Sequence, residues 1–83
     1  MKNITLIIPA KDESESLPLV LKKLKKFKFK INVVLHKSDT KTIKSIKYLK
    51  TKIIYQAQKG YGDALITGIN YCQTKFFCIF NAD

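Results

Sequence analysis

Arginine and tryptophan are absent from this sequence, although it has sixteen lysines and a formal net charge of +10. Proteins that read nucleic acid usually use the planar arginine side chain, which donates two parallel hydrogen bonds, whereas lysine offers only a point charge. The lack of arginine therefore argues against a nucleic-acid partner. Attraction of anionic ligands and weak adhesion to anionic lipid remain open as roles for the lysines.

Cysteine and long apolar runs are also scarce. Cys72 and Cys78 have no cysteine or histidine partners in a zinc-site spacing, so we expect free thiols in the core. No apolar run reaches the ~18 residues of a membrane span, and residues 1–3 lead into a short apolar stretch without a signal-peptide pattern. We therefore expect a cytoplasmic protein, with a peripheral position on the cytoplasmic membrane face as a further option.

The 83 residues are enough for one small domain, and 46% of them are hydrophobic. Short apolar stretches alternate with segments whose apolar residues recur at helical spacing. We expect strands at residues 4–8, 31–35, 52–55 and 76–80. Helices should begin after Asp12 or Ser14, after Ser38 or Asp39, and near Tyr61. This alternation predicts an α/β fold with a Rossmann-like parallel sheet of about four strands and three helices.

Two details of this pattern carry structural expectations. Residues 76–80 are continuously apolar, which is typical of a strand covered on both faces. In the 83 residues alone, we expect this last strand to be a hydrophobic edge whose covering segment is missing. Gly68 lies in the apolar stripe of the third helix, where it costs up to ~1 kcal/mol of helix propensity and close packing against the sheet could offset that cost.

In a parallel sheet, every turn from a strand to a helix lies on the same edge. The turns at residues 9–13, 36–39, 56–61 and 81–83 should therefore converge on one crevice. If the strand order is 3-2-1-4, the topological switch point falls between Pro9 and Asn81, where open α/β sheets bind ligands.

These turns resemble those of glycosyltransferase family 2, whose GT-A fold uses sugar nucleotides. Residues 9–13 (Pro-Ala-Lys-Asp-Glu) are similar to the Pro-Ala-x-Asn-Glu opening of the family. Residues 59–65 (Lys-Gly-Tyr-Gly-Asp-Ala-Leu), together with Gly68, are similar to its Gly-Lys-Gly-x-Ala-Leu-x-x-Gly segment. Residues 81–83 (Asn-Ala-Asp) stand where the family has Asp-x-Asp. The sequence Gly-Tyr-Gly before a helix, followed later by Asn-Ala-Asp, is similar to the branch of the family that transfers sugars to polyprenyl phosphates.

The resemblance implies a sugar-nucleotide-dependent glycosyltransferase of the hexosyltransferase kind, with a UDP- or GDP-sugar donor and a polyprenyl phosphate or glycan acceptor. It implies Mg²⁺ or Mn²⁺ held by Asp83, with Asn81 as a second ligand, and such hard ions prefer oxygen ligands and phosphate. The candidate donor-binding residues are Pro9, Ala10, Lys11, Glu13, His36, Lys59, Gly62, Asn81, Ala82 and Asp83.

The chain departs from the family pattern at two positions. After the second strand, Leu35 or His36 replaces the aspartate that the resemblance would place at the nucleobase, and we favour a solvated turn for His36 over a catalytic or metal role. Asn81 replaces the first aspartate of the last segment, and because an amide adds no charge we expect weaker metal binding.

The family domain is typically more than twice as long, so we interpret residues 1–83 as the N-terminal part of an incomplete glycosyltransferase family 2-like domain. No catalytic base is identified, and the 83 residues alone should be inactive. The alternative is a non-catalytic module that binds nucleotides or adheres to nucleic acid or membrane. A solvated helix end for the lysines of residues 22–30 and a frayed terminal carboxylate for Asp83 are the simplest structural interpretations.

Overall fold

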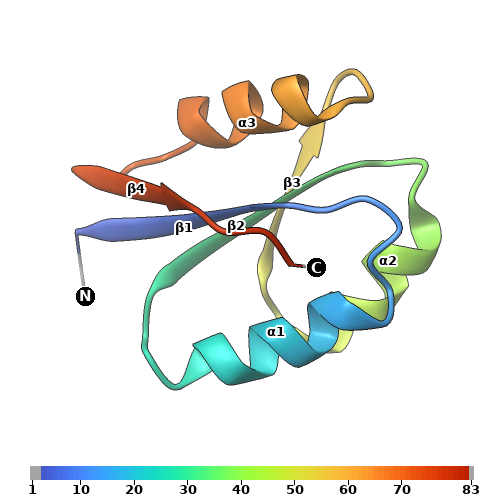
Figure 1. The fold of residues 1–83 in the computed structure, drawn as a ribbon, viewed down its shortest axis with the longest axis horizontal. Coiled ribbons are helices and arrows are strands. Elements are labelled where there is room, and N and C mark those ends of the chain that lie inside the picture. Colours follow the sequence, from blue (N-terminus) through green and yellow to red (C-terminus); the bar gives the residue numbers. More distant parts are fainter. Residues whose placement is uncertain (1–2, 83) are drawn as a thin grey trace.

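The structure is a computed structural model that describes residues 3–82 (Figure 1). Strands and helices alternate along the whole of this range. In chain order they are β1 (Ile4–Pro9), α1 (Ser16–Lys25), β2 (Lys30–His36), α2 (Thr40–Ile46), the 3-10 turn η1 (Lys47–Leu49), β3 (Lys52–Gln56), α3 (Tyr61–Asn70) and β4 (Phe76–Ile79). The four strands form one parallel sheet in the order β3-β2-β1-β4. The predicted α/β fold and strand order are confirmed.

Helices cover both faces of the sheet, with α3 on one face and α1 and α2 on the other (Figure 1). Neighbouring residues of β1 point to opposite faces, as strand geometry requires. Ile7 packs with Ala64 on the α3 side, whereas Ile8 packs with Leu17 and Ile46 on the α1–α2 side. Within the described residues, no helix is long and apolar enough to cross a membrane.

Gly68 is buried where α3 lies against the sheet. A Cβ atom at this position would clash with Ile7 Cγ2 and lie 3.1 Å from Val34 Cγ2. Ile7 and Val34 are both fully buried, so they have little room to move. The close packing that the sequence suggested for Gly68 is confirmed.

The last strand is a hydrophobic edge within residues 3–82, as expected for the 83 residues alone, and it is not covered on both faces. Phe76 is 56% exposed and Phe77 is 47% exposed, because β4 is an edge strand that pairs only with β1. Helix α3 packs on β1, β2 and β3 instead. Ile79 alone among the residues of β4 is half-buried, and it packs against the core cluster of Ile7 and Val34.

Helix α1 begins later than predicted, at Ser16. Neither Asp12 nor Ser14 caps it; Glu15 occupies the N-cap position without a side-chain capping bond. Asp12 instead adopts a left-handed conformation with φ of 53°. The backbone amides of residues 12 and 13 bind side chains of the α2 region, so the loop continues past the predicted helix start.

The prediction for the two cysteines is wrong in part. Both are free, but Cys78 is exposed on β4 and Cys72 follows α3, half-buried. The hydrogen bond between Cys72 Sγ and the Thr74 hydroxyl, at 3.4 Å, lowers the pKa of the thiol below its ordinary value. Tyr61 and Ile69 of α3 are also exposed.

We expect Gly68→Ala to lower the free energy of unfolding by about 1–2 kcal/mol, because overpacking outweighs the gain in helix propensity. Gly62→Ala is the matched control in the same helix. A Cβ atom at Gly62 meets nothing within 4 Å, so this variant should gain about 0.5–1 kcal/mol. Urea unfolding followed by circular dichroism measures both. Equal stabilisation of the two variants would contradict the close packing of α3.

Candidate functional site

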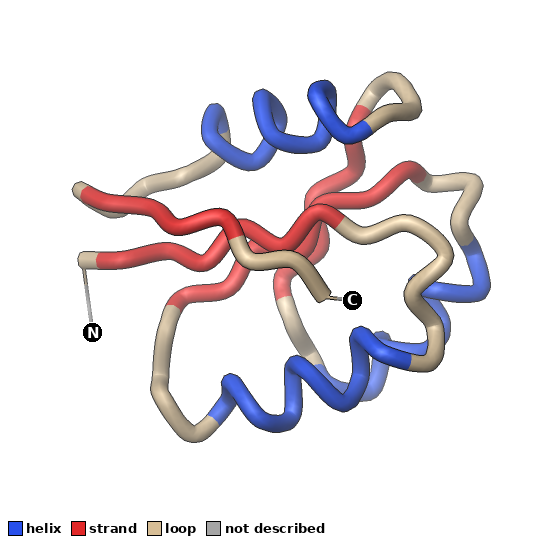
Figure 2. The backbone as a smooth tube through the Cα atoms, viewed as in Figure 1, coloured by secondary structure: helices blue, strands red, loops and turns tan. Residues whose placement is uncertain are grey.

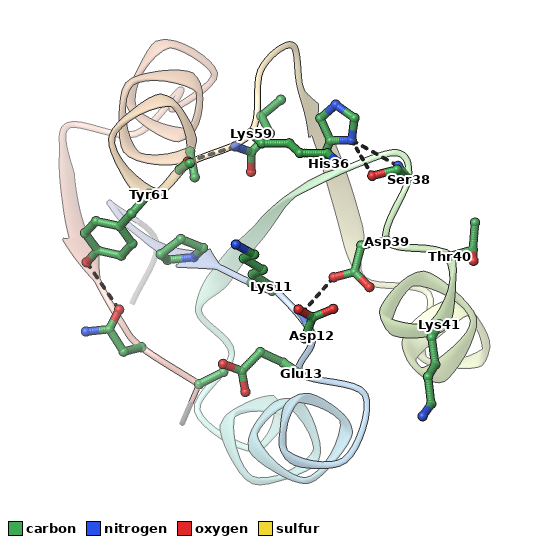
Figure 3. Close-up of a pocket in the computed structure, with 17 residues that line it drawn as sticks. Lys11, Asp12, Glu13, His36, Ser38, Asp39, Thr40, Lys41, Lys59 and Tyr61 are labelled. Atoms are coloured by element: carbon green, nitrogen blue, oxygen red, sulfur yellow. Dashed lines mark hydrogen bonds between the residues drawn. The ribbon is translucent and has the colours of Figure 1, made fainter.

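The turns that follow the four strands meet around one pocket of about 730 Å³ at the carboxyl edge of the sheet (Figure 3). β1 is central to this arrangement because it pairs with both β2 and β4. The pocket is lined by Pro9, Ala10, Lys11, Asp12, Glu13, His36, Ser38, Asp39, Thr40, Lys41, Gln56, Lys59, Gly60, Tyr61, Ala64, Asn81 and Ala82. The predicted convergence of the turns is confirmed for the described residues.

The wall formed by the β1–α1 loop is anchored to the start of α2. The backbone N–H of Asp12 donates to Asp39 Oδ2 at 2.9 Å, and that of Glu13 donates to Thr42 Oγ1 at 3.1 Å. Asp39 also accepts from the backbone N–H of Thr42 at 3.4 Å and so caps α2, one of the two capping residues that the sequence allowed. One carboxylate thus fixes both the helix start and the loop that faces it.

The loop after β3 is shaped by the buried side chain of Gln56. Its Nε2 donates to the carbonyl oxygens of Gln58 at 2.7 Å and Gly60 at 2.9 Å. Gly60 has φ of 122° and ψ of 153°, a conformation that is essentially restricted to glycine. Helix α3 begins at the next residue, so its N-terminus, with its unpaired amides and positive dipole end, opens onto the pocket.

The fourth side of the pocket is the segment that follows β4. The backbone N–H of Phe80 donates to the carbonyl of Ile7 at 2.9 Å, and Ala82 is buried in the core cluster of α1 and α2. Asn81 lies between these two anchors, and its Oδ1 accepts a hydrogen bond from the Tyr61 hydroxyl at 3.3 Å (Figure 3). The segment after β4 and the first residue of α3 therefore orient the Asn81 amide together.

His36 lines the pocket from the end of β2. Its Nδ1 accepts a hydrogen bond from the backbone N–H of Ser38 at 3.1 Å, and the Ser38 hydroxyl lies 2.8 Å from the same atom. A backbone N–H can only donate, so the neutral imidazole carries its proton on Nε2. The half-buried ring thus offers a hydrogen-bond donor where a carboxylate would offer an acceptor.

Lysines and carboxylates both face the pocket. Lys11 lies near its centre and Lys59 on the β3–α3 loop (Figure 3). Among the carboxylates, Asp39 is engaged by backbone amides, and Glu13 Oε2 accepts from Ser16 Oγ at 2.5 Å. The lining holds three lysines, Lys11, Lys41 and Lys59, and three carboxylates, of which those of Asp39 and Glu13 are engaged in hydrogen bonds.

The fit to a divalent metal is incomplete within residues 3–82. No group of three or more His, Cys, Asp or Glu side chains in this range could hold a metal ion. Asn81 Oδ1 offers one neutral oxygen ligand, which still has a second lone pair when Tyr61 donates to it. Asp83, the charged ligand that the sequence indicated, lies outside the described residues.

The pocket brings together most of the residues that the sequence indicated. Eight of them line it: Pro9, Ala10, Lys11, Glu13, His36, Lys59, Asn81 and Ala82. Gly62 does not; it is exposed on the first turn of α3. Sequence analysis missed the contact of Asp39 with the β1–α1 loop. It also missed the roles of Gln56 and Tyr61, whose only signal was their position at the end of a strand and at a helix start.

We expect Asp39→Ala to lower the free energy of unfolding by about 1–2 kcal/mol, because α2 loses its cap and the Asp12 amide loses its acceptor. Asp39→Asn keeps an acceptor oxygen and should lose less than half as much. Amide hydrogen exchange at Asp12 should accelerate only in the alanine variant. Unchanged exchange there would show that Asp39 does not anchor the β1–α1 loop.

Comparison with known protein families gives a match that is longer than the turn segments alone. The family model of glycosyl transferase family 2 matches residues 5–83, which include all four turns of the pocket. No curated protein and no solved structure matches the chain. The match spans nearly the whole sequence, and the parallel sheet with its carboxyl-edge pocket agrees with it. The chain belongs to glycosyl transferase family 2, as its turn sequences had indicated.

Proposed function

We propose that residues 1–83 form the donor-binding part of a cytoplasmic glycosyltransferase that transfers a sugar from a UDP- or GDP-sugar to a polyprenyl phosphate or a glycan. Glycosyl transfer follows from the family, whose members generally bind sugar nucleotides and depend on a divalent metal. The observation that carries the finer proposal is the single pocket on which the four post-strand turns converge. Its volume is within the range of about 300–1,000 Å³ typical of small-molecule sites.

The diphosphate of the donor would lie between Lys11, Lys59 and the N-terminus of α3. All three supply positive charge or unpaired N–H groups, which are what phosphate oxygens require. Gly60 supports this placement, because its glycine-restricted backbone directs the first turn of α3 at the pocket. Gln56 holds that conformation through the Gly60 carbonyl.

The nucleoside would lie against residues 9–13 and the end of β2. The anchored loop gives a wall of fixed shape there. His36 offers its Nε2–H, which complements a carbonyl oxygen or a ring nitrogen of the base. Because uracil and guanine both carry such acceptors, this contact supports a UDP- or a GDP-sugar equally.

Asn81 and Asp83 would hold Mg²⁺ or Mn²⁺ beside the diphosphate. The structure supports one of the two positions, since Tyr61 and the buried Ala82 fix the backbone and side chain of Asn81 at the rim of the pocket. When bound, the ion supplies positive charge to the departing nucleoside diphosphate. Lys11 and Lys59 would add to the same stabilisation.

Transfer with inversion requires either a carboxylate base to deprotonate a hydroxyl acceptor or a phosphate acceptor that needs none. We assign no base within residues 3–82. Asp39 is held by backbone amides and Glu13 by Ser16, so both serve the architecture of the pocket. The acceptor site and the base therefore stay outside this proposal.

Calorimetric titration with UDP-glucose and GDP-mannose, with and without Mn²⁺, tests the proposal. We expect metal-dependent binding that Asp83→Ala abolishes, because this change removes the only charged ligand of residues 81–83. Asn81→Asp should strengthen the binding by adding a charge. Glu15→Gln is the matched control: it removes a carboxylate that does not line the pocket, and the affinity should not change.

One result would refute this function, and a second would remove Asn81 from the metal site. If no sugar nucleotide binds in a metal-dependent way while duplex DNA binds with a steep salt dependence, the chain is a basic module and the donor site is refuted. If Asn81→Asp leaves the metal affinity unchanged, Asn81 is not a ligand and the metal would be held by Asp83, water and diphosphate alone.

A further inference from the structure

Charge is segregated between the two edges of the sheet. No aspartate or glutamate occurs in residues 16–38 or 40–62. The acidic residues that the structure describes lie around the carboxyl edge, in the β1–α1 loop, at the cap of α2 and in the first turn of α3. Six lysines of residues 22–30 and three of residues 47–52 are all exposed and surround the opposite edge, where α1 and η1 lead into β2 and β3. We call these nine lysines the lysine pole.

Aromatic rings are exposed among these lysines. Phe27, in the connection from α1 to β2, is 54% exposed, and Tyr48 in η1 is 61% exposed. Lys26 Nζ lies 5.7 Å from the ring centroid of Phe27, and Lys22 Nζ lies 5.5 Å from that of Tyr48. Apolar rings set among cations at the surface are the combination that favours an anionic lipid interface, where rings enter the headgroup region and lysines reach the phosphates.

A shallow groove of about 250 Å³ lies between the two halves of the lysine pole. Lys25, Lys50 and Lys52 line it together with apolar side chains of Leu21, Phe29 and Leu49. Cationic groups of this kind complement the phosphate of an anionic lipid headgroup. The apolar side chains beside them complement the first methylene groups of the acyl chains. A nucleic-acid strand fits this surface less well, because lysines alone give it no bidentate contact to phosphates or bases.

We propose that the lysine pole is a docking surface for an anionic phospholipid membrane, with the ring of Phe27 entering the interface. The connections that lead into β2 and β3 lie at the opposite edge of the sheet from the turns that follow the strands (Figure 2). The lysine pole is therefore independent of the pocket that those turns line. A bilayer at the lysine pole leaves the pocket facing the aqueous side. Of the two acceptor classes proposed above, this orientation favours a glycan that approaches from solution.

Co-sedimentation of the chain with phosphatidylcholine vesicles, with and without added phosphatidylglycerol, tests the surface in the absence of any nucleotide. Binding should require the anionic lipid and should be lost at about 1 M salt, where the Debye length is ~3 Å. Lys25→Gln combined with Lys28→Gln should weaken binding about 30-fold, since each lysine near an anionic surface contributes a factor of about five. Lys37→Gln combined with Lys44→Gln removes the same charge outside the pole and should weaken binding much less.

The absence of tryptophan allows a direct reading of which face meets the bilayer. In Phe27→Trp, the single indole should shift its emission to shorter wavelength when anionic vesicles are added. Tyr55→Trp, at a position of β3 that is 53% exposed and outside the pole, should show no such shift. Far-ultraviolet circular dichroism establishes that each variant is folded.

Three results would overturn the proposal. The first is equal loss of vesicle binding in the two lysine double variants, which would mean that only net charge matters. The second is an unshifted Phe27→Trp emission on bound vesicles. The third is failure to bind vesicles combined with tight binding of single-stranded RNA that depends on Lys25 and Lys28, which would assign the surface to nucleic acid.

Discussion

The pairing of β1 with β2 on one side and with β4 on the other is the constraint on which the rest of the structure depends. Because all four strands are parallel, this pairing places every strand-to-helix turn on one edge of the sheet. The chain leaves β1 toward the α1–α2 face and approaches β4 from the α3 face (Figure 1). The pocket lies at the carboxyl end of β1, between these two connections. The pocket is a consequence of this topology, and individual side chains only refine it.

Hydrogen bonds to buried or capping side chains give this pocket a defined shape. Asp39 connects the loop after β1 to the start of α2, and Gln56 holds Gly60 in the conformation from which α3 starts. Tyr61 extends the same network to Asn81 across the pocket. The four turns are thus joined in two pairs, the first with the second and the third with the fourth, by contacts between segments that are distant in sequence. Such contacts are the pre-organisation that an anionic ligand needs.

The sequence predicted the features that local pattern controls. Strand and helix order, the order of the sheet, the convergence of the turns and the close packing at Gly68 all follow from periodicity, glycine placement and the rules for parallel connections. The start of α1 was mispredicted because Asp12 and Glu13 bind partners 27 and 29 residues away, a competition that no local signal reveals. The apolar run of β4 indicated burial, yet its place at the edge of the sheet leaves Phe76 and Phe77 exposed. The role of Gln56 depends on loop geometry and had no sequence signal beyond its position at the end of β3.

The two edges of the sheet carry different chemistry, with an anchored polar pocket at one and the lysine pole at the other. The central claim is that a sugar nucleotide and its metal ion bind at the edge of the sheet that carries the pocket. They should not bind at the more strongly basic edge that carries the lysine pole. Paramagnetic broadening by Mn²⁺ in the presence of UDP-glucose or GDP-mannose, read residue by residue in amide spectra, tests this claim most directly. The account predicts broadening that is strongest at Lys11, Tyr61 and Asn81 and absent around Lys28 and Lys50. Broadening centred on the lysine pole, or spread evenly over both edges, would contradict it.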